Sequence, residues 1–369
     1  MIITRTPLRI SFAGGWTDIA SFYKKNSYGS ILSCAINKYI YVSVKNHSNI
    51  YPEKIRLNYS ETEHVNNVDK IKNPIIKACL KHLEIDDNLY ISTVADAPGS
   101  TGLGSSSTFC VGLLNALYAY KGKVVNRNKL AEEAASIEIE ILKRPIGKQD
   151  HYAAAFGSVN LYKFYANENV SIMPVDENSK NIKMIFDNLY TFYIGMSRDA
   201  SKVLSKQKKR SLINNSNLLK IRDQAEELFY LIKGEKFSIK KFGEFLEHGW
   251  ELKKNLANQV SNKFIDEAYT IAKKNGVYGG KLSGAGGGGF LSFVSQKKFK
   301  NELINSLIKK KLKYFPVQLD SSGSIILSKN WYEEKNIDNR MWWIPRKLFD
   351  PISFRKRGIW NSRVWYWIF

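Results

Sequence analysis

The chain has 369 residues, of which 44% are apolar, and its 56 basic and 34 acidic residues give a formal net charge of +22. A chain of this length can bury a large core, which we expect to be divided between two domains. The positive charge would suit nucleic acid, an acidic surface or a phosphorylated substrate. No zinc-ligand spacing, RNA-binding aromatic signature or recognition-helix motif accompanies it. Much of the charge lies in runs such as 206–210 and 309–311, which are typical of solvated helix faces. We therefore expect no nucleic-acid partner.

The three cysteines, Cys34, Cys79 and Cys110, are far apart in the sequence and lie in apolar contexts. This usage is typical of reduced core cysteines in a cytosolic protein. No signal peptide precedes the first predicted strand, and no apolar run is long enough to cross a bilayer. The expectation is a soluble, cytoplasmic protein without a membrane span.

The first predicted element is a strand over residues 2–12, where polar and apolar residues alternate. It carries Arg5 and Arg9 and leads into a turn with paired glycines that reaches Asp18. Charged side chains at a strand end beside such a turn often face a ligand, although a plain strand with a tight turn is an alternative. The next predicted elements are a strand over 31–44 and a short helix over 73–82.

A glycine-rich stretch, Pro98-Gly-Ser-Thr-Gly-Leu-Gly-Ser-Ser-Ser-Thr108, lies between a strand predicted over 89–95 and a helix predicted over 109–118. Its glycines allow the backbone to approach a ligand closely. Ser105 and Ser106 stand where the helix begins, with free N–H groups and a partial positive charge. This arrangement predicts an anion site, most naturally for phosphate. The stretch lacks the Gly-Lys-Ser/Thr ending of a P-loop and the GxGxxG spacing of a dinucleotide fold.

Two further helices are predicted over 127–142 and 148–156. Glu138 lies beside the apolar face of the first helix, where an ordinary exposed carboxylate is the usual case. Asp150, near the start of the second helix, could simply balance the charge of the helix N-terminus. His151 is more typical of a packing or hydrogen-bonding histidine than of a ligand, because no second histidine sits at metal-binding spacing.

The second half mixes strands with helices, which suggests an α+β sandwich with helices on one face. Strands are predicted over 158–162, 189–194 and 291–294, with two short ones near Pro316 and Ile325, and helices over 218–232, 237–256, 263–274 and 298–311. A second glycine-rich stretch, Tyr278 to Phe290, precedes the strand at 291–294. Residues 338–369 are rich in Trp and Arg and have no clear periodicity.

Three glycine-containing stretches, in this order and spacing, resemble the GHMP family of small-molecule kinases. They are Arg5-Thr-Pro-Leu-Arg-Ile-Ser-Phe-Ala-Gly-Gly-Trp-Thr-Asp18, the loop Pro98 to Ser107, and Lys281-Leu-Ser-Gly-Ala-Gly-Gly-Gly-Gly-Phe290. The resemblance covers about residues 1–330 and implies a two-domain α+β fold. It places an N-terminal α/β domain with the glycine-rich phosphate loop over 1–190 and a C-terminal ferredoxin-like α+β sandwich over 191–330. The Trp/Arg-rich tail over 331–369 receives no role, and we expect it to be irrelevant to catalysis.

Within this family, the sequence looks closest to the D-glycero-D-manno-heptose 7-phosphate kinases. Besides the first motif, the supporting stretches are Gly147-Lys-Gln-Asp-His-Tyr-Ala-Ala-Ala-Phe-Gly157, Ser197-Arg-Asp-Ala-Ser201 and Glu247-His-Gly-Trp-Glu-Leu-Lys-Lys254. Two residues depart from that pattern. Trp16 replaces a third glycine and resembles fucokinase-like members instead, and Ser158 replaces a second glycine in what is predicted to be a turn.

The resemblance implies roles for individual residues. Asp150 is similar to the catalytic aspartate, and Arg9 to the arginine that helps orient and activate the acceptor hydroxyl. Glu138 and Ser106 resemble ligands of Mg²⁺, whose octahedral oxygen shell ATP oxygens and waters would complete. The ATP phosphates would rest on Pro98, Gly99, Gly102, Leu103, Gly104, Ser105, Ser106 and Ser107. The residues implied in sugar binding are Gly15, Thr17, Asp18, Gly284 and Gly286, and the candidates for its phosphate are Arg198, as first choice, Lys148 and Lys281.

The sequence therefore predicts an ATP-dependent sugar kinase that uses Mg²⁺. Its substrate would be D-glycero-D-manno-heptose 7-phosphate, which it would phosphorylate on the anomeric hydroxyl to give the 1,7-bisphosphate. This product would be a precursor of nucleotide-activated heptose for lipopolysaccharide or capsule. One alternative is a fucokinase-like enzyme for an unphosphorylated sugar. Another is a basic nucleic-acid-binding protein on a degenerate kinase fold, against which the joint presence of Asp150, Glu138, Ser106 and Arg9 argues. The sequence leaves a homodimer open.

Overall fold

The computed structural model describes residues 1–195, 215–256, 260–284 and 286–329, which belong to one unit over Met1–Asn330. The strands are β1 Ile2–Ala13, β2 Tyr28–Asn46, β3 Ile55–Asn58, β4 Thr62–Val65, β5 Leu89–Ala95, β6 Val159–Tyr165, β7 Val170–Pro174, β8 Leu189–Tyr193, β9 Val277–Leu282, β10 Phe290–Ser295, β11 Lys313–Tyr314 and β12 Ile325–Lys329. The helices are α1 Ala20–Tyr23, α2 Pro74–His82, α3 Ser105–Tyr120, α4 Arg127–Ser136, α5 Gln149–Phe156, α6 Lys180–Asp187, α8 Asn215–Lys233, α9 Ile239–Lys254, α10 Lys263–Lys274 and α11 Lys300–Lys309.

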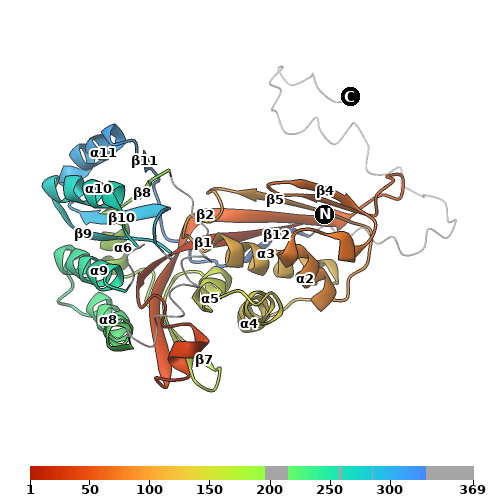
Figure 1. The fold of residues 1–369 in the computed structure, drawn as a ribbon, viewed down its shortest axis with the longest axis horizontal. Coiled ribbons are helices and arrows are strands. Elements are labelled where there is room, and N and C mark those ends of the chain that lie inside the picture. The colour runs from red at the N-terminus through yellow and green to blue at the C-terminus, as the bar shows by residue number, and fades with distance from the viewer. Residues whose placement is uncertain (196–214, 257–259, 285, 330–369) are drawn as a thin grey trace, which may run out of the picture. The chain divides into compact units, whose positions relative to one another are not determined.

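The first half is built on a large mixed sheet with the strand order β12-β1-β2-β5-β3-β4. β2 is 19 residues long and pairs with β5 through its second half and with β6 through its first half. The pair β1·β2 is antiparallel and sets Arg9 opposite Ala35, while β3 and β5 run parallel. The C-terminal end of β1 points toward the second sheet (Figure 1). Its last residues line the candidate active site.

The last strand returns to the first sheet. The sequence predicts a short strand near Ile325 within the second half, and the structure has one there, but β12 pairs antiparallel with β1, with Ile325 opposite Arg5. Local patterning carries no information about which sheet a strand joins, because both sheet edges offer unpaired backbone groups. The domain boundary expected near residue 190 stays a prediction.

Helix α3 is the central helix of the first half. It contacts β1 and β2 on one side and α2, α4 and α5 on the others (Figure 1). The sequence Phe109 to Ala119 is apolar on nearly every face, and all but one of these residues are buried. A helix that is apolar all round needs such cover. This packing fixes the position of the α3 N-terminus, which directly follows the glycine-rich loop.

The helix predicted over 127–142 is present over 127–141, but its last turn is not α-helical. α4 stops at Ser136 and continues as a π-helical turn, Ile137–Ile141. A π turn rotates the following side chains relative to an α-helix and is frequent at functional sites. Glu138 is consequently fully buried instead of being the exposed carboxylate that is usual at such a position.

The second half contains a four-stranded antiparallel sheet in the order β11-β8-β10-β9. Helices α9, α10 and α11 cover it (Figure 1), and a core that includes Trp250, Phe192 and Phe293 lies between the two layers. The predicted α+β sandwich is confirmed. The three cysteines are free and buried, as expected. Among the helices that the structure describes, none is long and apolar enough to cross a membrane.

Candidate active site

A cavity of about 560 Å³ brings together segments that are far apart in the sequence. Its walls come from the end of β1 and the following turn, the glycine-rich loop with the start of α3, the turn before α5, helices α8 and α9, and the stretch after β9. Predicted site residues in its lining are Arg9, Gly15, Asp18, Gly102, Gly104, Ser105, Ser106, Ser107, Glu138, Asp150, Lys281 and Gly284. All three glycine-containing motifs therefore meet at one cavity.

The glycine-rich loop presents an uncapped helix end to this cavity. Gly104 caps α3 with φ of +80° and provides no side-chain hydrogen bond to the first turn. A Cβ atom on Gly104 would lie 3.3 Å from both the Arg9 and the Asp150 side chains, so only glycine fits without strain. The Oγ of Ser105 is buried and has no hydrogen-bond partner within the described part of the chain. Free N–H groups and this hydroxyl fit an anionic ligand such as phosphate.

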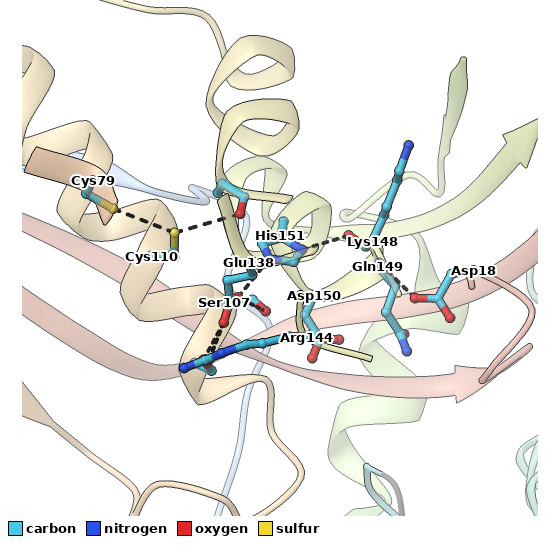
Figure 2. Close-up of polar contacts among 12 residues, drawn as sticks. Asp18, Cys79, Ser107, Cys110, Glu138, Arg144, Lys148, Gln149, Asp150 and His151 are labelled. Atoms are coloured by element: carbon cyan, nitrogen blue, oxygen red, sulfur yellow. Dashed lines mark hydrogen bonds and ion pairs between the residues drawn. The ribbon is translucent and has the colours of Figure 1, made fainter. Parts of the chain in front are cut away.

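Glu138 is the centre of a polar cluster beside the helix end (Figure 2). Its carboxylate accepts hydrogen bonds from Ser106 Oγ at 2.5 Å, Ser107 Oγ at 2.7 Å and His151 Nε2 at 2.8 Å. Burial acts to raise the pKa of Glu138, but the hydrogen bond and charge of His151, with the two serine hydroxyls, outweigh it and lower the pKa to about 2. Glu138 is therefore ionised at neutral pH. His151 is a buried hydrogen-bonding residue, as its sequence context predicted.

The guanidinium of Arg144 reaches the Glu138 carboxylate (Figure 2). The same nitrogen, Nη1, also donates to Ser106 Oγ, which is itself bonded to Glu138. A positive charge thus already bridges the two residues that the resemblance pairs as metal ligands. Among the described residues, no cluster of three or more His, Cys, Asp and Glu side chains could hold a metal by itself. One carboxylate and one hydroxyl fit a Mg²⁺ ion that takes most of its ligands from water and a nucleotide.

Arg9 and Asp150 form a two-pronged ion pair at the cavity wall. Nε of Arg9 lies 2.6 Å from Asp150 Oδ1, and Nη2 lies 2.8 Å from Oδ2. Nη1 of Arg9 donates to the carbonyl of Gly102 at 2.6 Å, which ties the pair to the glycine-rich loop. The Arg9 side chain is 5% exposed and that of Asp150 is 23% exposed. Asp150 is therefore held rigidly by its partner and still open to the cavity.

Asp18 approaches the same turn from the other side. Its Oδ2 accepts the backbone N–H of Gln149 at 3.0 Å (Figure 2). A Cβ atom on Gly147 would lie 1.9 Å from that carboxylate oxygen, so Asp18 needs glycine there. Burial raises the pKa of Asp18 to about 6, and the nearby Asp150 charge contributes to the increase.

Several predicted site residues lie away from the cavity lining. Lys148 pairs with Glu168 and points away from Glu138 and Asp18 (Figure 2), which argues against it as a phosphate ligand. The hydroxyl of Thr17 is buried and donates to the Gly14 and Ser30 carbonyls, at 2.8 and 2.9 Å. Pro98, Gly99, Leu103 and Gly286 are also absent from the lining, and Arg198 lies outside the described residues.

Sequence reasoning missed several polar residues of the lining, among them Ser11, Arg144 and Lys253. Ser11 lies two positions after Arg9 on β1, so strand alternation places it on the same face. Lys253 lies in the stretch Glu247 to Lys254, which resembles the heptose kinases, but that resemblance implies no role for this lysine. The only feature of the sequence that could have indicated Arg144 as a site residue is its position in the turn before α5.

These features together define a small-molecule kinase: a glycine loop on a helix N-terminus, a buried ionised carboxylate beside it, and an aspartate open to the same cavity. The models of the N-terminal and C-terminal domains of GHMP kinases match residues 70–158 and 215–312. D-glycero-alpha-D-manno-heptose 7-phosphate kinase from Campylobacter jejuni is 30% identical over 333 residues, which is 84% of this chain and 93% of that protein. The chain belongs to the GHMP kinase family, and it is an ATP-dependent sugar kinase.

Two further similarities bear on the substrate. L-fucokinase/L-fucose-1-P guanylyltransferase from Bacteroides fragilis is 25% identical over 337 residues, which is 79% of this chain and 34% of that protein. A solved D-glycero-D-manno-heptose 1-phosphate kinase from Bacteroides thetaiotaomicron superposes with a TM-score of 0.72 at 24% identity, covering 89% of this chain and 99% of that one. This structural similarity confirms the expected two-domain fold.

Proposed function

We propose that the chain transfers the γ-phosphoryl group of ATP to the anomeric hydroxyl of D-glycero-D-manno-heptose 7-phosphate and produces the 1,7-bisphosphate. The observation that carries the proposal is the Arg9–Asp150 pair, which lies in one cavity with the uncapped N-terminus of α3. The similarity to the Campylobacter jejuni heptose 7-phosphate kinase supports this choice of sugar. The product would be a precursor of nucleotide-activated heptose for a surface polysaccharide. The reaction would take place in the cytoplasm.

The nucleotide phosphates would rest on the glycine-rich loop and the first turn of α3. The free N–H groups there and the unpartnered Ser105 hydroxyl would donate hydrogen bonds to phosphate oxygens. Glu138 and Ser106 would hold Mg²⁺, which would neutralise charge on the transferring phosphoryl group. His151 and Ser107 would keep the Glu138 carboxylate in place through their hydrogen bonds.

Asp150 would accept the proton of the attacking hydroxyl, or orient it. Arg9 occupies one side of the Asp150 carboxylate and leaves the other side open to the cavity. Its charge would offset the negative charge that develops on the transferring group. Asp18, buried in the cavity wall, would accept hydrogen bonds from sugar hydroxyls.

A second candidate function is that of a fucokinase-like enzyme. Trp16 lines the cavity with φ of +79°, a conformation that glycine adopts freely and other residues rarely do. Its side chain lines the cavity, where a glycine would leave space open. The relative from Bacteroides fragilis agrees with this alternative.

One experiment distinguishes the heptose 7-phosphate kinase function from the fucokinase-like function. The full-length protein is supplied with ATP, Mg²⁺ and a panel of sugars that includes heptose 7-phosphate, unphosphorylated heptose and L-fucose, and ADP release is followed with a coupled assay. The proposal expects the highest kcat/KM for heptose 7-phosphate. Faster turnover of L-fucose than of heptose 7-phosphate would favour the second function.

A further inference from the structure

Two lysines of the second half line the cavity without a carboxylate partner. Lys253 lies near the C-terminal end of α9, and Lys281 lies near the end of β9. Lys281 is buried, and its Nζ donates to the carbonyl of Phe12 at 3.0 Å. Nζ of Lys253 donates to the carbonyls of Leu282, at 3.3 Å, and Gly284. Within the described ranges, no carboxylate oxygen lies within 4.0 Å of either ammonium group.

The electrostatics of this pair are unfavourable unless a negative charge is added. Burial, together with the charge of Arg9, lowers the pKa of Lys281 to about 7. Burial also lowers the pKa of Lys253 well below its ordinary value, and the charges of Lys281 and Arg9 act in the same direction. The carboxylate of Asp150 compensates the charge of Arg9 but that of neither lysine. A cation held away from water without a counter-charge is costly, so the two lysines fit an anionic ligand in this cavity.

A third polar group independently indicates a ligand at the same wall. Ser11 is 7% exposed, lines the cavity and has an Oγ that forms no hydrogen bond within the described part of the chain. It precedes Phe12, whose carbonyl receives the Lys281 hydrogen bond. A buried hydroxyl of this kind usually has a partner, and a phosphate oxygen would supply one.

We propose that Lys253, Lys281 and Ser11 form a binding site for a phosphate dianion, and that its occupant is the phosphate already carried by the acceptor sugar. This inference rests on the proposed function for the choice of occupant. Two ammonium groups without carboxylate partners and a buried hydroxyl match the chemistry of a phosphate monoester. Lys253 is a member that the sequence did not indicate, and it takes the place that the sequence gave to Lys148.

The same chemistry could receive the γ-phosphoryl group of ATP. The acceptor's phosphate is favoured because Lys281 is bonded to the strand end that leads to Gly15 and Asp18, the wall proposed to hold the sugar. The start of α3, in contrast, offers its own free N–H groups and the Ser105 hydroxyl to the nucleotide.

The test uses the full chain with Lys253→Met and Lys281→Met, since Met keeps the length of the side chain and removes the charge. Lys254→Met is the matched control, because Lys254 follows Lys253 on α9 but pairs with Glu251 and lies outside the cavity lining. Thermal unfolding is recorded with no ligand, with Mg·ATP, and with inorganic phosphate added at saturating Mg·ATP, so that the nucleotide already occupies the phosphate-binding end of α3. KM is then measured separately for heptose 7-phosphate and for ATP.

Both cavity variants are expected to unfold at or above the parent's temperature without ligand, to lose the stabilisation by inorganic phosphate and to keep the stabilisation by Mg·ATP. Their KM for heptose 7-phosphate should rise about tenfold or more, with the KM for ATP within about threefold. The control should behave as the parent. Parent-like phosphate stabilisation in both variants would overturn the site, and loss of Mg·ATP stabilisation instead would assign it to the nucleotide. If the parent used no phosphorylated sugar, the proposed function would fail, and the inorganic phosphate measurements would still decide whether the anion site exists.

Discussion

Replacement of Asp150 by Asn removes a proton acceptor and half of an ion pair. Arg9 donates two hydrogen bonds to Asp150, at 2.6 and 2.8 Å. An Asn side chain retains one acceptor oxygen and turns an NH₂ group toward the other guanidinium N–H, so one charge-assisted bond is lost. Such a bond contributes about 1.5–3 kcal/mol. The substitution also leaves the Arg9 guanidinium, which is 5% exposed, without its carboxylate partner, so we expect a loss of folding stability of up to about 3–5 kcal/mol. Loss of a positioned general base lowers kcat by about 10²–10⁴-fold.

The assay compares Asp150→Asn with the parent by ADP release at saturating ATP and sugar, and measures ATP binding by a fluorescent-nucleotide titration. We expect kcat to fall by at least about 10²-fold, while ATP affinity changes little because Asp150 lies outside the glycine-rich loop. Asp86→Asn is the control, since Asp86 is an exposed carboxylate paired with Lys54. A kcat of the folded variant within about threefold of the parent's would refute the role of Asp150, given the 10²-fold minimum expected of such a group.

Three further predictions follow from the site and the chain's C-terminal region. Glu138→Gln and Ser106→Ala should raise the Mg²⁺ concentration needed for half-maximal activity, and magnesium titrations that superimpose on the parent's would exclude both as ligands. Truncation after Asn336 removes residues that lie outside the described part of the chain, and activity should persist; a soluble but inactive product would show that the tail matters for catalysis. Because the pKa of Asp18 is raised from 3.8 to about 6, the folded state binds an extra proton between these values, and its stability falls as pH rises through them. Chemical denaturation should therefore show Asp18→Asn gaining up to about 3 kcal/mol over the parent from pH 4 to pH 6, whereas a constant difference would contradict the raised pKa.

The elements that the sequence predicted well are those with strong local periodicity. The helices at 215–233, 239–254 and 263–274 and the strands at 89–95 and 189–193 lie within a few residues of their predicted bounds. The position of the glycine-rich loop at the N-terminus of a helix is also as predicted. Apolar spacing and turn chemistry act over a few residues, so they can be read without knowing the fold.

Features that depend on tertiary packing were not predictable in this way. The π turn at Ile137–Ile141 carries Glu138, whose carboxylate is bonded to Ser107 of α3 and His151 of α5, and an α-helical period cannot indicate these contacts. The return of β12 to β1 is a pairing between opposite ends of the unit. Lys148 and Lys253 look alike in sequence, yet one pairs with Glu168 and the other faces the cavity.

The identity of the phosphorylated hydroxyl tests the central claim most directly. The full-length protein is incubated with ATP, Mg²⁺ and heptose 7-phosphate, and the product is analysed by phosphorus and proton NMR. The account predicts a second phosphate ester whose phosphorus couples to the anomeric proton, with the original ester intact. Phosphate on any other hydroxyl, or turnover confined to an unphosphorylated sugar such as L-fucose, would contradict it.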